Sequence, residues 1–154
     1  GVQTCALPIL WEMSNTTGPY SRFQLKQYIE QTQNDLFADR QLRLMIENGN
    51  RQVVGIVDLC SFDPLHNRAE VGIMVDKSCR RRGIGRNALA LLEEHCFRYL
   101  GIHQLFAYIA VENLPSRRLF AACGYKESAV LKEWAHTFGG GYTDVLVVQK
   151  LNLS

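Results

Sequence analysis

Residues 75–86 combine glycines and arginines at the point where a strand pattern gives way to a helix pattern. Backbone N–H groups in the first turn of a helix have no carbonyl partner, and the helix dipole adds partial positive charge there. Gly83 and Gly85 leave room for an anion to approach the main chain, because neither carries a β-carbon. Arginines supply side-chain charge around the same turn: Arg80, Arg81, Arg82 and Arg86. The junction therefore predicts a phosphate-binding turn.

Two other interpretations of this turn stay open from the residues alone. Runs of basic residues are usually solvated, so residues 80–82 could form a plain basic turn. A dinucleotide-binding fingerprint would need Gly-x-Gly-x-x-Gly, and Gly83-Ile84-Gly85-Arg86 offers only the first half of it.

The elements on either side of the turn are clear. Apolar and other residues alternate strictly from Ala69 to Asp76, which predicts a strand with two distinct faces and places Glu70 opposite the apolar row. Apolar residues then recur at helical spacing from Gly83 to Leu100, and Gly101 is the expected helix stop.

The remaining elements follow from periodicity and turn residues. We predict an amphipathic helix over 21–37, an antiparallel hairpin of 42–46 and 53–59 around 48–50, a strand over 104–111, a short helix over 115–123 and a final strand over 142–151 after the glycines 139–141. This order predicts a mixed α/β sheet in a single domain.

The motifs resemble those of the GNAT acetyltransferases. Their signature, Gln or Arg-x-x-Gly-x-Gly or Ala between the fourth strand and the third helix, matches Arg80-Arg81-Arg82-Gly83-Ile84-Gly85. Downstream, Asn113-Leu114-Pro115-Ser116 followed by Cys123-Gly124-Tyr125 resembles the family's Asn-x-x-Ser helix that ends in Gly-Phe or Gly-Tyr. The resemblance implies the GNAT fold, an α/β (α+β) arrangement with a mixed, mostly antiparallel central sheet flanked by helices, and acetyl-CoA as co-substrate.

Within the family, residues 19–151 most resemble the spermidine and diamine acetyltransferases in sequence, for example at 66–70 and 141–145. By that comparison the chain lacks the family's first strand and first helix, and residues 1–11 look foreign to a domain over 12–154. We therefore expect the edge of the strand that starts at Leu42 to lie open, which is a liability for aggregation.

The resemblance also implies a mechanism. Backbone N–H groups near Ile73, Met74 and Val75 would bind the thioester carbonyl and stabilise the developing oxyanion. A substrate ammonium with a pKa of about 10 must lose a proton before it attacks, so a carboxylate, or a water that it holds, is needed as base. Glu70 is the candidate catalytic base, and an ion pair with Arg68 is its alternative role. The implied acetyl-CoA contacts are Ile73, Met74, Val75, Arg80, Arg81, Arg82, Gly83, Ile84, Gly85, Arg86, Asn113, Ser116 and Phe120.

Phe120 departs from the polyamine acetyltransferases, which carry at this position a tyrosine proposed to protonate the departing thiolate. Water could take over that role, or the chain could lie nearer the ribosomal-protein and N-terminal acetyltransferases. A non-catalytic acyl-CoA-binding module is a further alternative. Tyr125 is expected to be a packed aromatic ring.

The acceptor is predicted to be a primary amine, either a small polyamine such as spermidine or a peptide amine. Residues 18–26 resemble the family's acidic polyamine-binding loop but contain no acid, which weakens the spermidine assignment. Other acids that could contact a cationic acceptor are Glu30, Asp35, Asp39, Glu133 and Asp144. Trp134 and Tyr142 could line the acceptor channel, but packing of the last hairpin is the preferred role.

Composition excludes several classes of function. A formal net charge of +2 from 17 basic and 15 acidic residues argues against a nucleic-acid or membrane surface. The five cysteines and four histidines show no metal-ligand spacing, so no metal is expected. A cytoplasmic enzyme is predicted, and homo-oligomer formation stays open.

Overall fold

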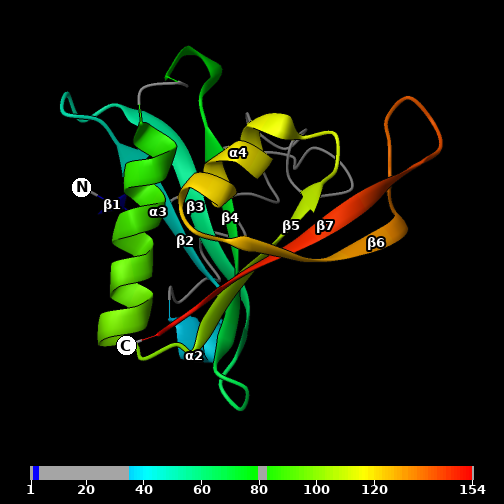
Figure 1. The fold of residues 1–154 in the computed structure, drawn as a ribbon. Coiled ribbons are helices and arrows are strands. Elements are labelled where there is room, and N and C mark those ends of the chain that lie inside the picture. Colours follow the sequence, from blue (N-terminus) through cyan, green and yellow to red (C-terminus); the bar gives the residue numbers. More distant parts are fainter. Residues whose placement is uncertain (1, 4–34, 80–82, 154) are drawn as a thin grey trace.

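The computed structural model describes residues 2–3, 35–79 and 83–153. Seven strands form one sheet in the order β1-β2-β3-β4-β5-β7-β6. The strands are β1 (Val2–Gln3), β2 (Leu42–Glu47), β3 (Val53–Asp63), β4 (Arg68–Val75), β5 (Gln104–Ala110), β6 (Lys126–His136) and β7 (Tyr142–Leu151). Neighbouring strands are antiparallel except β4 and β5, which are parallel. Two helices, α3 (Ile84–Glu94) and α4 (Leu114–Ala122), lie in front of this sheet in Figure 1, and the arrangement confirms the predicted fold class.

The face of β4 toward the helices carries the core, as the alternation predicted. Ala69 and Val71 are buried and belong to one cluster with Leu89 and Leu92 of α3. Helix α3 is amphipathic, and burial of its apolar side holds the helix against the sheet. The side chain of Glu70 is only partly buried on the opposite face.

Strand β3 is longer than the predicted segment 53–59 and contains an irregularity. Cys60 pairs with Glu70 and Asp63 pairs with Arg68, so two residues of β3 stand opposite Ala69 alone. This is a β-bulge, and Ser61 within it has a positive φ of 50°. Period-two alternation cannot anticipate a bulge, because the extra residue breaks the period.

The hairpin of β2 and β3 is confirmed, but its turn differs in detail from the expectation. The positive φ falls on Arg51 at 58° rather than on Asn48, Gly49 or Asn50. The side-chain oxygen of Asn48 accepts hydrogen bonds from the backbone N–H groups of Asn50 (2.9 Å) and Gln52 (3.0 Å), so the asparagine closes the turn.

The helix predicted over 21–37 is wrong at its C-terminal end. Asp35 is extended, and its carboxylate accepts hydrogen bonds from the N–H groups of Phe37 (2.9 Å) and Ala38 (3.4 Å). A separate short helix, α2 (Leu36–Asp39), therefore starts after this cap. The rest of the predicted helix, residues 21–34, lies outside the described residues.

The expectation of an open edge on β2 is wrong at two positions. Val2 pairs with Ile46 and Gln3 pairs with Met45, so β1 covers that part of the edge. Backbone groups of an edge strand readily take up such a partner. The domain bounds, with residues 1–11 foreign to a domain over 12–154, stay a prediction.

The end of α3 differs from a simple α-helix. After Glu94 the chain forms a π-helical turn over His95–Tyr99, and Gly101 with a φ of 64° then ends the helix as predicted. The last hairpin, β6 and β7, projects at its loop end beyond the rest of the sheet (Figure 1). Gly140 and Gly141 form its turn with φ values of 88° and 85°.

Candidate active site

Strands β4 and β5 run side by side only over a short distance. Their residue pairs are Arg68 with Gln104, Ala69 with Leu105, and Glu70 with Phe106. Beyond this point β4 continues to Val75 and β5 to Ala110 without further pairing. The two strands therefore separate after Glu70, and each presents a backbone edge to the opening.

A cavity of about 510 Å³ lies where the ends of β4, α3 and α4 meet. Its walls are Ile73, Met74, Val75, Cys79, Gly83, Ile84, Gly85, Arg86, Asn113, Pro115, Ser116, Arg118 and Leu119. The predicted contacts Ile73, Met74, Val75, Gly83, Ile84, Gly85, Arg86, Asn113 and Ser116 are thus brought together. Arg80, Arg81 and Arg82 lie outside the described residues.

Four cavity residues were not anticipated: Cys79, Pro115, Arg118 and Leu119. Cys79 directly precedes the arginine turn. On α4, Leu119 lies three residues after Ser116 and four after Pro115, and Arg118 lies three after Pro115, which are the spacings of neighbours on a helix surface. Helical periodicity around Asn113 could therefore have identified them.

The first turn of α3 faces this cavity. Gly83 is the N-cap with a φ of 75°, a left-handed conformation that L-residues with a β-carbon rarely adopt. Glycine offers no side chain to cap the helix, so the N–H groups of the first turn stay available to a ligand. A β-carbon at Gly85 would lie 3.2 Å from Cδ2 of Leu119, so this glycine also permits the close approach of α3 and α4.

The N-terminus of α4 lines the same cavity. Asn113 is its N-cap, and its side-chain oxygen accepts a hydrogen bond from the N–H of Ser116 at 3.3 Å. Pro115 lies in the first turn, where its missing N–H costs no hydrogen bond. Two helix N-termini therefore add their partial positive charge to one cavity, beside Arg86 and Arg118.

Glu70 stands at the last paired position before the strands separate. A rise of about 3.3 Å per residue places it roughly 10 Å along β4 from Ile73, where the cavity begins. Burial raises the pKa of its carboxyl above the ordinary value, while hydrogen bonds from Cys60 and Ser61 act in the opposite direction. Arg68, the alternative ion-pair partner, instead contacts Asp63 at 3.5 Å.

Phe120 does not line the cavity. Its ring is buried and packs edge-on against Tyr125, with the ring centroids 4.9 Å apart. The packed role predicted for Tyr125 is confirmed, and burial raises the pKa of its hydroxyl. The structure therefore places Phe120 in the core beneath α4 rather than among the cavity residues.

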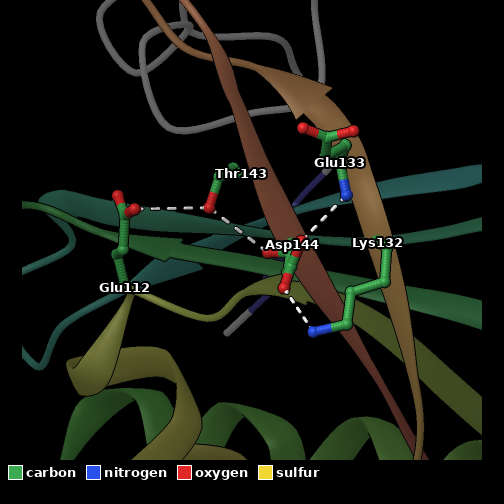
Figure 2. Close-up of polar contacts among 5 residues, drawn as sticks. All are labelled: Glu112, Lys132, Glu133, Thr143 and Asp144. Carbon is green, nitrogen blue, oxygen red and sulfur yellow. Dashed lines mark hydrogen bonds and ion pairs between the residues drawn. The ribbon is translucent and has the colours of Figure 1, made fainter.

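Asp144 of β7 makes its contacts within the β6–β7 hairpin, as Figure 2 shows. Its carboxylate accepts hydrogen bonds from the N–H of Glu133 at 2.8 Å and from Nζ of Lys132 at 3.0 Å, and these contacts lower its pKa. Leu131 pairs with Val145 and Ala135 with Thr143, so residues 132–134 bulge opposite Asp144. The aspartate closes this bulge.

The other acids suggested for a cationic acceptor have varied positions. Asp35 caps α2, and the carboxylate of Asp39 accepts from the N–H of Asp35 at 3.4 Å. Glu133 is exposed, and Glu30 lies outside the described residues. Trp134 and Tyr142 are 61% and 65% exposed on the projecting hairpin. The Tyr142 ring packs edge-on against His136 of β6 with the ring centroids 5.3 Å apart, as the preferred packing role predicts for this residue.

Two kinds of feature are absent from the described part of the chain. Residues 2–3, 35–79 and 83–153 contain no cluster of three or more His, Cys, Asp or Glu side chains that could hold a metal ion. Within the same ranges, no helix has the length and apolar character needed to span a membrane.

Comparison with known proteins identifies the fold and the chemistry. The family model of the acetyltransferase (GNAT) domain matches residues 3–126. The chain belongs to the GNAT acetyltransferase family. It is an N-acetyltransferase that transfers an acetyl group to an amine, and GNAT acetyltransferases take this group from acetyl-CoA.

Individual relatives agree with this assignment. The chain is 27% identical to spermidine N(1)-acetyltransferase of Vibrio cholerae over 128 residues, covering 82% of this chain and 72% of the relative. It is 36% identical to an N-acetyltransferase 9-like protein of Nematostella vectensis over 96 residues, covering 56% of this chain and 48% of that relative. A solved dodecameric structure of spermidine N-acetyltransferase from Vibrio cholerae superposes with a TM-score of 0.74 at 26% identity, covering 88% of this chain and 77% of that one.

Proposed function

We propose that this GNAT chain acetylates a small primary amine, of the polyamine class, with acetyl-CoA bound between α3 and α4. The observation that carries the proposal is the convergence of two helix N-termini on one cavity at the end of β4, beyond the point where β4 pairs with β5. The Vibrio relative supports the acceptor class, because its name is spermidine N(1)-acetyltransferase.

The diphosphate of acetyl-CoA would lie against the first turn of α3. Gly83 and Gly85 allow backbone N–H groups to approach the phosphate oxygens, and Arg86 adds a full positive charge. The same role is proposed for Arg80, Arg81 and Arg82 from their place in the motif. Asn113 and Ser116 would contact the remainder of the molecule from α4, whereas Phe120, the buried residue of the same helix, would anchor the helix to the core.

The thioester would lie at the end of β4. Backbone N–H groups around Ile73, Met74 and Val75 would bind its carbonyl oxygen, which gains negative charge as the amine nitrogen attacks the carbonyl carbon. The carbon–nitrogen bond would form, the carbon–sulfur bond would break, and the thiolate would leave. The attacking nitrogen would lose its remaining extra proton as the amide forms. Because Phe120 has no hydroxyl, a water molecule would take up this proton and pass one to the thiolate.

Glu70 would accept the proton that the acceptor ammonium loses. It lies at the base of the opening, on the face of β4 that bears Met74, and the distance of roughly 10 Å to Ile73 leaves room for the amine or a bridging water. Partial burial raises the pKa of Glu70 and makes it a stronger base than an exposed carboxylate.

The test is release of CoA thiol from acetyl-CoA with a panel of spermidine, spermine, a monoamine and a peptide with a free N-terminus. We expect thiol release to be fastest with a polyamine. Replacement of Glu70 by Gln should lower kcat by a factor on the order of 10² or more while acetyl-CoA affinity stays nearly unchanged.

Glu94→Gln, an exposed position on α3, is the matched control and should leave kcat unchanged. Acetyl-CoA binding without thiol release for any amine would reject the enzymatic role. Preference for the peptide would favour the N-terminal acetyltransferases over the polyamine class. We also propose that the chain forms homo-oligomers, which the dodecameric Vibrio structure supports.

A further inference from the structure

The bulge in β3 places two consecutive side chains beside Glu70. In a regular strand Ser61 would point to the face opposite Cys60, because successive side chains alternate. Cys60 is the cross-strand partner of Glu70, yet Oγ of Ser61 also donates a hydrogen bond to Oε2 of Glu70 at 3.3 Å. The left-handed conformation of Ser61, with a φ of 50°, turns its side chain to the Glu70 face.

This conformation has a cost that the surrounding structure must offset. Serine rarely adopts positive φ, and residues held there gather at functional sites. The next residue anchors the bulge: Phe62 is buried, its N–H donates to the carbonyl of Arg40 at 3.0 Å, and its ring packs edge-on against Phe37. The fold therefore holds Ser61 in place from outside the contact with Glu70.

We infer that Ser61 is a positioning residue for the reaction, which orients the Glu70 carboxylate and keeps it ionised by donating a hydrogen bond to it. The inference rests on the proposed role of Glu70 as base. A hydroxyl that donates to a carboxylate favours the charged form, which is the form that accepts a proton. Ser61 is exposed in part of its surface, so the hydroxyl can also bind a water beside the carboxylate.

The other groups on this face do not replace Ser61. Cys60 of β3 donates to the same carboxyl, and burial raises the pKa of this thiol to about 12, so the thiol stays protonated. The charged residues on this face of the neighbouring strands are already in ion pairs. These pairs are Arg43 of β2 with Asp58 of β3 at 2.7 Å, and Arg68 of β4 with Asp63 at 3.5 Å. On β5, Glu70 faces the uncharged Phe106.

The experiment measures the titration of Glu70 directly. The full chain is labelled with ¹³C in the glutamate carboxyl groups, and the Glu70 signal is assigned by its loss in Glu70→Gln. Ser61→Gly removes the hydroxyl and accepts the positive φ, so it should fold. Its Glu70 titration midpoint is expected to rise by roughly half to one pH unit, and the acid side of the kcat profile should move to higher pH by the same amount.

Ser61→Asn and Ser128→Gly complete the design. Asparagine tolerates left-handed backbone and carries an N–H donor, so it should restore most of the wild-type midpoint. Ser128 is an exposed serine of β6 and should leave the midpoint unchanged. A midpoint in Ser61→Gly equal to that of the wild type overturns the inference, as does a shifted midpoint with an unmoved kcat profile. Failure of the wild-type chain to acetylate any amine would remove the proposed function, and the titration would still report on the contact itself.

Discussion

Glu70 is partly buried and Glu93 is buried, but the two carboxyl groups have different hydrogen-bond partners. Among the described residues, Glu70 receives hydrogen bonds from a hydroxyl and a thiol, which leave its charge uncompensated. Glu93 of α3 is buried and meets Nζ of Lys150 at 2.6 Å. Burial therefore raises the pKa of Glu70, which suits a proton acceptor, whereas the carboxylate of Glu93 is held by an ion pair.

The Glu93–Lys150 pair leads to a prediction on stability. Replacing Lys150 by Met would leave a buried carboxylate without its cation and should lower the free energy of unfolding by about 3 to 5 kcal/mol. The double variant Glu93→Leu with Lys150→Met should recover most of this loss, because no buried charge remains. Urea unfolding followed by tryptophan fluorescence measures both changes.

Lys126→Met, an exposed lysine of β6, is the matched control and should keep the wild-type urea midpoint. Equal stability of the wild type and Lys150→Met would show that water enters the site and compensates Glu93. The pair would then contribute nothing to the fold.

Strands β3 and β4 approach each other so closely at one position that only glycine fits. A β-carbon on Gly55 would collide with the backbone oxygen of Met74, and it would lie 3.2 Å from Cα of Val75. These two residues of β4 also line the cavity. Gly55 therefore holds the cavity end of β4 against β3.

Gly55→Ala should lower the free energy of unfolding by about 1 to 3 kcal/mol, because β3 and β4 must move apart to make room. It should also weaken acetyl-CoA binding, since the end of β4 shifts. Gly72→Ala is the matched control on the same strand pair: its β-carbon would lie 3.8 Å from Cβ of Asp58, an ordinary contact. Thermal unfolding and calorimetric titration with acetyl-CoA compare the two, and equal behaviour would contradict the prediction.

Sequence periodicity predicted the elements wherever one pattern ran without interruption. The strand at Tyr142–Leu151 has the predicted bounds, and β4 has the predicted two faces. Periodicity did not predict the two places where a pattern is interrupted, the bulge at Ser61 and the π-helical turn at His95–Tyr99. These irregularities depend on contacts with residues distant in the sequence, such as Phe62 with Phe37. The bounds of α2 depended on one capping carboxylate.

The candidate site was predictable to the extent that it is contiguous in sequence. Gly83 to Arg86 and Asn113 to Ser116 lie in two short motifs, and each motif contains a helix N-terminus. Lys150 and Glu93, by contrast, are separated by 57 residues, and no local pattern links them. The hydrogen bond from Ser61 to Glu70 could not be predicted from the sequence either, because it forms only where the bulge turns Ser61 toward Glu70.

On the scale of the whole molecule, the sheet consists of two parts. Strands β1 to β4 form one part and β5, β7 and β6 form the other, joined by the three residue pairs between β4 and β5. The Glu93–Lys150 pair links them a second time, since α3 packs on β4 and Lys150 belongs to β7. A ligand in the cavity would contact β4, α3 and α4 together.

Acetyl-CoA should therefore stabilise the whole chain against heat. At a concentration 100 times its Kd, binding to the folded state alone contributes about 2.7 kcal/mol, which corresponds to a rise in Tm of roughly 5 to 10 °C. Differential scanning fluorimetry with acetyl-CoA measures it, and sodium acetate at the same concentration is the control. A rise no larger than that with acetate would place the ligand elsewhere.

The joint between β4 and β5 is short enough to act as a hinge. With only three residue pairs in it, a small rotation of one part against the other would widen or narrow the opening at a small cost in backbone hydrogen bonds. Glu70 lies on this hinge and Met74 lies beyond it. Opening would thus carry the end of β4, where we propose that the thioester binds, away from β5 while Glu70, the proposed base, keeps its place. Entry of acetyl-CoA and release of CoA would then leave the proposed proton acceptor undisturbed.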